Sequence, residues 1–166
     1  MKRIVTAVMS VNLLIGALGL LYIWWRSRDP SVVALSALGT TTDAALAEML
    51  RADAAGAAMT WWALVILGAA ICAAVWLMLA WRKQPATPQQ ARSGGLSWWL
   101  LLAAVLAIAL AAGYRVYVND AVAQAWRTTL ILGGMLVLPV AYFLSTALGV
   151  KGAMAPSVPL ATLIRR

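Results

Sequence analysis

The 166-residue sequence has no histidine, one cysteine and only five acidic residues. Without histidine, the chain lacks the usual haem ligand, the commonest metal ligand and the side chain that titrates near neutral pH. The single cysteine, Cys72, has no partner for a disulfide within the chain and says nothing about the redox compartment. We therefore expect no bound cofactor and no metal site.

Acidic side chains are also missing from every long apolar run. The five acids are Asp29, Asp43, Glu48, Asp53 and Asp120. A transporter coupled to protons or sodium normally keeps an ionisable group within the membrane, so coupled transport by this chain alone is not expected. A nucleophile needs a base within hydrogen-bond reach, and Cys72 has no histidine or acid near it in sequence. The sequence therefore does not predict an enzyme.

The residues that are abundant are apolar. Hydrophobic residues make up 64% of the chain and charged residues 11%, with a mean hydropathy of +0.87, whereas soluble domains are about half apolar and a quarter charged. The apolar residues form four blocks, at about 4–25, 57–81, 97–118 and 129–150, and about 20 residues of helix cross a bilayer core. The sequence predicts one all-α membrane domain, residues 1–166, with four transmembrane helices.

The first block has an alternative interpretation as a cleaved secretory signal, because Met-Lys-Arg precedes it. The block is longer than the apolar part of a typical signal. Trp24, Trp25 and Arg26 also stand where small residues at a cleavage site belong. We therefore predict a membrane span that stays in the protein.

The charges predict the orientation of the spans. With the N-terminus inside, the inner segments hold eight cations, the outer segments five cations, and all five acids lie outside. The inner cations are Lys2, Arg3, Arg82, Lys83, Arg92, Lys151, Arg165 and Arg166. Cytoplasmic segments carry the excess of lysine and arginine, so both termini are expected in the cytoplasm. The alanine-rich composition and short loops favour a bacterial inner membrane. The net charge of +8 is scattered between apolar blocks, so nucleic acid is not an expected partner.

Eight of the nine tryptophans lie near the predicted ends of spans, where an amphipathic indole suits the membrane interface. We expect them to be interface anchors: Trp24, Trp25, Trp61, Trp62, Trp81, Trp98, Trp99 and Trp126. Only Trp76 falls well inside a span.

The segments between spans differ in character. The outer segment 26–56 contains Pro30, which should end the first helix, and a short amphipathic helix from about Ala44 to Ala55. Its apolar face carries Leu46, Met49 and Leu50, which would lie on the membrane surface or against a partner. The linker 82–96 is rich in proline and glycine and is predicted to be flexible. The tail 151–166 is basic and would bind anionic headgroups or dock on a larger assembly.

Small and polar residues are expected to hold the spans together, because lipid is as apolar as leucine and gives helices no hydrophobic reason to associate. The predicted close-packing residues are Gly16, Gly19, Gly68, Ala69, Gly133 and Gly134. The predicted polar contacts within the membrane come from Asn12, Thr60, Ser145 and Thr146.

Three functions fit these patterns. The first is a non-catalytic subunit or scaffold of a larger membrane complex, with the bilayer and other membrane proteins or copies of itself as partners. The second is a channel or transport component formed by self-association, with polar residues lining a passage. The third is a sensor or regulator that uses the outer helix. The first function is favoured, because the spans contain no residues expected to carry catalysis or coupled transport.

Overall fold

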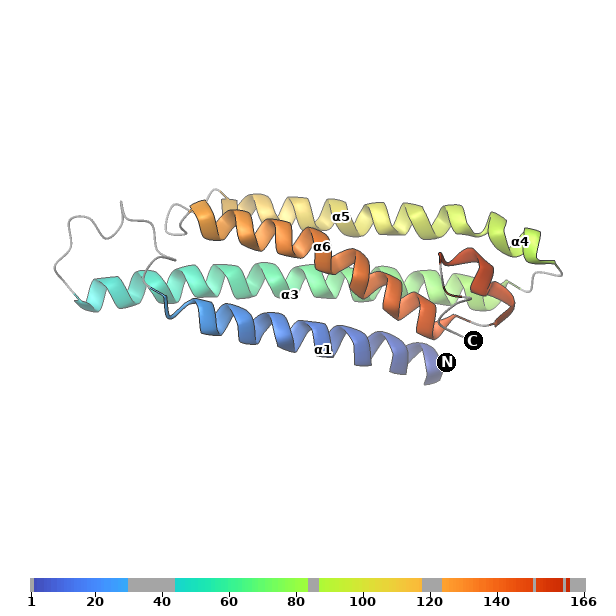
Figure 1. Cartoon of the computed structure of the whole chain (residues 1–166), viewed down its shortest axis with the longest axis horizontal. Helices are drawn as coiled ribbons and strands as arrows, with labels where there is room; N and C mark the ends of the chain where they lie inside the picture. The colour runs from blue at the N-terminus through green and yellow to red at the C-terminus, as the bar shows by residue number, and fades with distance from the viewer. Residues whose placement is uncertain are drawn as a thin grey trace.

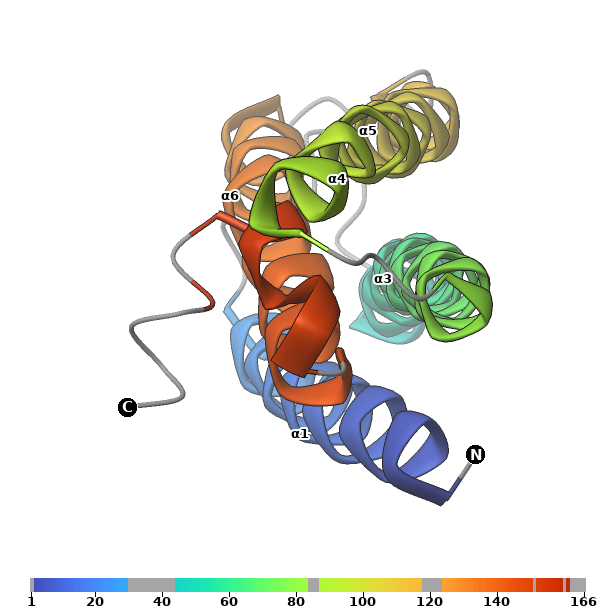
Figure 2. The same ribbon diagram turned by 90° about the vertical axis from the view of Figure 1, so that its right-hand side faces the viewer.

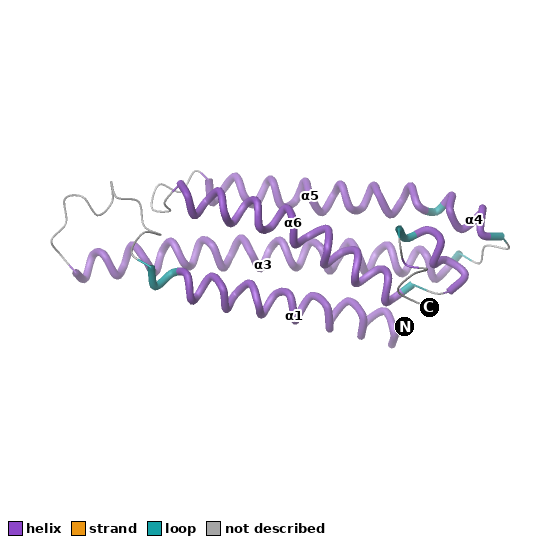
Figure 3. Tube along the Cα trace, in the orientation of Figure 1, coloured by secondary structure: helices purple, strands orange, loops and turns teal. Residues whose placement is uncertain are grey.

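The computed structural model describes residues 2–29, 44–83, 87–117, 124–150, 152–159 and 161. These residues form four long helices and two short ones, and no strand occurs among them. The long helices are α1 (Lys2–Arg26), α3 (Ala44–Arg82), α5 (Gly95–Tyr117) and α6 (Gln124–Gly149). Figure 1 shows them side by side and alternating in direction, with both termini at one end of the bundle. Figure 3 shows how little of the described chain is not helical.

Three of the helical stretches are long and apolar enough to cross a membrane: Ile4–Arg26, Ala45–Arg82 and Gln89–Ala111. A shorter apolar stretch, Gly134–Gly149, lies in α6. The expectation of an all-helical membrane protein therefore agrees with the structure. The helical runs of leucine, alanine, isoleucine and valine keep most backbone amides bonded within their own helices, which suits hydrocarbon.

Helices α3 and α6 form the centre of the bundle, because each packs against all three other long helices. Viewed from the end in Figure 2, the four long helices surround a common core, with α1 and α5 at opposite sides. The largest fully buried side chain, Trp76, comes from α3, and the next, Tyr142, comes from α6. These two helices therefore supply the largest side chains of the core.

The outer amphipathic helix predicted for 44–55 is not a separate element. It forms the first part of α3, which continues through Gly56 without a break over 39 residues. One glycine costs a helix only about 1 kcal/mol relative to alanine, and the flanking residues are strong helix formers. At 1.5 Å per residue, α3 is about 58 Å long, roughly twice the thickness of a bilayer core. The predicted break at Pro30 lies outside the described residues.

The linker predicted to be flexible contains the short helix α4 (Pro88–Ser93). The Thr87 side chain accepts a hydrogen bond from the Gln90 backbone N–H at 3.3 Å, and Pro88 occupies the first turn, where its missing N–H costs nothing. The first part of the tail forms a 3-10 helix, η2 (Gly152–Ser157), which packs against α4. Ala91, Met154 and Val158 are buried there. Local capping and this contact explain why the segment is ordered despite its composition.

Tryptophan rings packed on glycines join the helices. A Cβ atom at Gly19 of α1 would overlap the indole of Trp62, and one at Gly134 of α6 would overlap the indole of Trp61. The Trp62 N–H also donates to the Gly16 carbonyl of α1 at 3.0 Å. The glycines were expected to bring helix backbones together, and at these positions they instead make room for aromatic rings.

This packing predicts a clear difference between two glycine substitutions. Gly19→Ala should displace Trp62 from α1 and lower the stability of the detergent-solubilised protein by about 1–3 kcal/mol, as overpacking does. Gly56→Ala is the matched control, because a Cβ there has no atom within 4 Å, and it should raise stability slightly through helix propensity. Thermal unfolding monitored by circular dichroism measures both. Equal melting temperatures for Gly19→Ala and the wild type would contradict the packing role.

Candidate functional site

A groove between α1 and α6, with α3 as its floor, is the candidate site. Its volume is about 660 Å³. The wall from α1 consists of Ile15, Leu18, Gly19, Tyr22 and Ile23. The wall from α6 consists of Gly134, Leu136, Val137 and Val140, and the adjacent Trp61 and Trp62 of α3 form the floor. The lining is almost entirely apolar, so the groove suits hydrocarbon rather than water or ions.

The shape of the groove follows from the path of α6. Figure 1 shows the first half of α6 beside α5 and the second half crossing towards α1. Pro139 lies inside α6, where it has no N–H to donate to the carbonyl one turn earlier. Proline is a usual cause of helix bending. Helices α1 and α6 therefore meet near the chain termini and separate towards the opposite end, where the groove lies.

A buried polar contact marks the point where the two walls meet. The Asn12 side-chain amide of α1 donates to the Ser145 hydroxyl of α6 at 3.0 Å and to the Val8 carbonyl at 2.8 Å. Both side chains are buried. Asn12 stands one turn before Ile15 in α1, and Ser145 follows Val140 in α6. This contact joins α1 to α6 just beyond the groove-lining residues of both helices.

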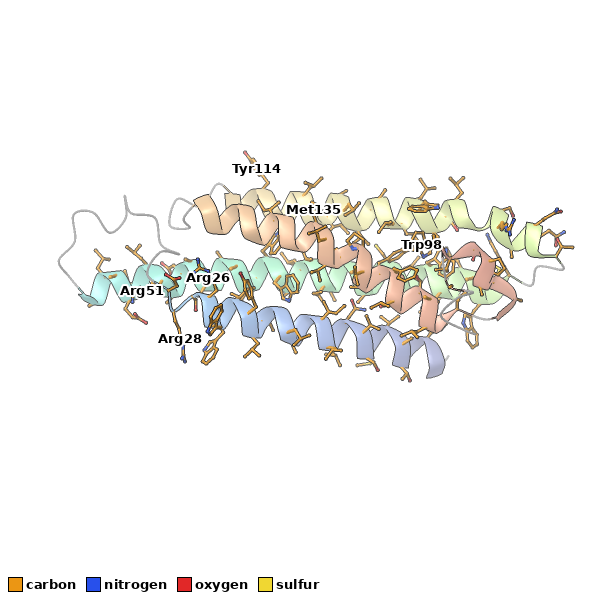
Figure 4. All side chains as sticks on the ribbon, in the orientation of Figure 1. Arg26, Arg28, Arg51, Trp98, Tyr114 and Met135 are labelled. Atoms are coloured by element: carbon orange, nitrogen blue, oxygen red, sulfur yellow. The ribbon has the colours of Figure 1, made fainter. Side chains whose placement is uncertain are left out.

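A second polar cluster ties α5 to α6 on the other side of α6. The Trp98 N–H donates to the Thr146 hydroxyl at 2.9 Å, and the Tyr142 hydroxyl donates to the Trp98 carbonyl at 3.1 Å. The centres of the Trp98 and Tyr142 rings lie 5.1 Å apart. Figure 4 labels Trp98, which lies in the half of the bundle that holds the chain termini. Thr146 was predicted from the sequence, whereas the role of Tyr142 was missed. Its signal was a phenol inside an apolar run, which needs a hydrogen-bond partner when buried.

The four predicted intramembrane polar residues do not line one passage. Asn12 pairs with Ser145, and Thr146 binds Trp98 on a different side of α6. Thr60 is exposed on α3 and donates to the Gly56 carbonyl of its own helix at 2.8 Å. Three buried side-chain atoms have no hydrogen-bond partner among the described residues: the Asn12 side-chain oxygen, the Arg51 Nε and the Trp61 indole nitrogen. Within a single chain, these polar groups serve helix contacts rather than a continuous polar path.

The predicted tryptophan anchors divide into two groups. Trp24, Trp25 and Trp99 are exposed, as a ring facing lipid would be. Trp61, Trp62 and Trp98 are buried between helices, and the half-buried Trp81 donates to the Gly149 carbonyl at 3.3 Å. These four therefore differ from the lipid-facing placement that the sequence suggested. Adjacent tryptophans project at different angles from a helix, so one of a pair can be buried while the other is exposed. The side chain of Trp126 lies outside the described residues.

The remaining predicted site residues lie on α3 and α6. Gly68 packs against Ile108 of α5 so closely that a Cβ atom at Gly68 would lie 3.2 Å from the nearest side-chain atom of Ile108, and Ala69 is fully buried. Met49 is exposed, while Leu46 and Leu50 are partly buried. Gly133 lies in α6, but its surroundings are outside the described part. The groove residues Leu18, Leu136 and Val140 were missed, because single exposed apolar residues in a span carry no sequence signal.

Charged residues follow Ile23, the last groove-lining residue of α1. Arg26 forms an ion pair with Asp29, and the Arg28 guanidinium lies 3.8 Å from the centre of the Trp24 ring. Arg51 and Glu48 form a second pair at 3.3 Å in the first part of α3. Figure 4 places Arg26, Arg28 and Arg51 at the same end of the bundle. No group of three or more potential metal-binding side chains occurs among the described residues.

No family model, curated protein or solved structure matches this chain. Its function has to be inferred from its own residues and their arrangement.

The contact between Asn12 and Ser145 can be tested by a double-mutant cycle with Asn12→Ala and Ser145→Ala. We expect a coupling free energy of about 0.6 kcal/mol, the average for polar contacts between membrane helices. The free energies of unfolding of the wild type, the two single variants and the double variant are measured by unfolding with a denaturing detergent in micelles. The control cycle pairs Asn12→Ala with Thr60→Ala, whose hydroxyl bonds only its own helix in the structure, and should give no coupling. Equal coupling in the two cycles would refute a specific contact.

Proposed function

We propose that this chain is a non-catalytic integral-membrane subunit or scaffold of a larger complex in a bacterial inner membrane. In this proposal the four long helices cross the bilayer and both termini lie in the cytoplasm. Eight cations and no acid fall in the segments that the sequence assigns to the inner side, and this asymmetry supports the orientation. The buried polar groups that bond helix to helix support a structural role.

The observation that carries the proposal is the length of α3. A helix of about 58 Å extends well past a bilayer core of about 30 Å. Figure 1 shows its first turns extending past the end of α1. This segment presents the exposed Met49 beside Leu46 and Leu50, with the Arg51 and Glu48 pair on an adjacent face. An apolar stripe on a helix outside the hydrocarbon is suited to bind a partner protein.

The two other functions receive less support from the arrangement. A self-associating channel would place polar side chains on a shared surface, yet Asn12 and Ser145 are buried against each other. A sensor would use the same projecting segment of α3 as a scaffold does. A sensor differs from a scaffold in releasing or changing its partner when a ligand binds, so the two are distinguished by the permanence of the complex.

The projecting segment is tested by the triple substitution Leu46→Ser, Met49→Ser and Leu50→Ser. The full-length protein, extracted from its native membrane in mild detergent, is expected to elute with a stoichiometric partner. The triple variant should lose at least about tenfold in partner retention, because truncating central interface residues typically costs more than 1 kcal/mol each.

The matched control carries Glu48→Ser, Ala52→Ser and Asp53→Ser on exposed positions of the same segment, and should keep the partner. Circular dichroism verifies that both triple variants remain helical. A wild-type protein that elutes alone as a monomer would overturn the proposal.

A further inference from the structure

We propose that the groove between α1 and α6 binds one phospholipid of the surrounding leaflet, with an acyl chain against Trp61 and Trp62 and the phosphate near Arg26. The proposal goes beyond a scaffold function and does not require one. It rests on the depth of the groove, on the tryptophan rings that cover its two glycines, and on the arginines that follow its α1 wall.

The depth of the groove matches one leaflet. Its α1 wall runs from Ile15 to Ile23, which is about 12 Å of helix. Half of a bilayer core is about 15 Å thick. The hydrogen bond between Asn12 and Ser145 joins α1 to α6 one turn before Ile15, the first groove-lining residue of α1. A chain entering from the end of the bundle therefore reaches the joined part of α1 and α6 at about the depth where its own leaflet ends.

The walls fit an acyl chain better than a further helix. Helices approach one another in membranes over small residues, but the two glycines of this groove are covered by Trp61 and Trp62 of the same chain. The rims carry the exposed side chains of Leu18 and Leu136. A flexible polymethylene chain can enter the slot between the rims.

The charge at the open end selects a phosphate-bearing headgroup. Arg26 follows Tyr22 by four residues, so it continues the groove-lining face of α1 by one turn. Its guanidinium, already paired with Asp29, has five N–H donors in a planar fork and can bind a phosphate as well. Arg28 lies nearby against Trp24. A neighbouring groove of about 530 Å³, between α1 and α3, lies further from Arg26, because its lining on α1 ends at Leu20 whereas that of the first groove reaches Ile23.

The test measures phospholipid retention by native mass spectrometry. Full-length protein is reconstituted into vesicles of phosphatidylethanolamine and phosphatidylglycerol, extracted in mild detergent and partly delipidated. The wild type is expected to retain one phospholipid per chain. Leu136→Trp fills the groove from an exposed rim position and should reduce retention about tenfold, a change of 1.4 kcal/mol. Leu110→Trp, at an exposed position of α5 outside both grooves, is the matched control and should retain the lipid.

A competition with diacylglycerol, which lacks the phosphate, tests the headgroup contact. The wild type should prefer the phospholipid, and Arg26→Gln should lose that preference while still binding the acyl chain. Retention by Leu136→Trp equal to that of the wild type would overturn the proposal, as would a wild type that keeps no lipid. A retained mass that corresponds to a second protein chain, lost in Leu136→Trp, would also overturn it and assign the groove to a protein contact. None of these outcomes depends on whether the projecting part of α3 has a partner.

Discussion

The packing of tryptophan rings from α3 onto glycines of α1 and α6 is the interaction on which the rest of the structure depends. In hydrocarbon, helices gain nothing by hiding apolar surface from water, so shape complementarity and a few hydrogen bonds must hold them. Trp62 supplies both, through its contact with Gly19 and its bond to the Gly16 carbonyl. Because these rings come from one helix, α3 sets the positions of its neighbours and leaves the groove where α1 and α6 separate.

The sequence predicted an all-helical protein with long apolar helices, because such helices depend on local composition. It also identified Asn12 and Ser145 as polar groups within the apolar runs, because such groups need partners in lipid. The sequence could not show that these two residues bond to each other. Their bond depends on how α1 crosses α6, and the two residues are 133 positions apart along the chain. The same limit applies to the groove, whose walls come from separate helices and whose residues look like ordinary lipid-facing side chains.

Two local features of the structure differ from the boundaries that the sequence suggested. The outer helix was predicted over 44–55, apart from the following span, and the linker around Pro88 was predicted to be flexible because it is rich in proline and glycine. At Gly56 the flanking helix formers outweigh the small cost of one glycine. Pro88 begins a helix instead of breaking one, since Thr87 caps it. The sequence placed each tryptophan along the membrane axis. It did not give the direction in which each ring points from its helix, and that direction decides whether the ring faces lipid or the core.

The unbroken course of α3 has a mechanical consequence. A single helix of 39 residues carries both the first turns, which extend past the end of α1 (Figure 1), and Trp81, which bonds to Gly149 near the other end of the bundle. A tilt imposed on the first turns is carried by a continuous ladder of backbone hydrogen bonds, as by a stiff lever, to the opposite end of the bundle. Whatever pulls on that outer tip therefore also strains the contact between α3 and the last turn of α6.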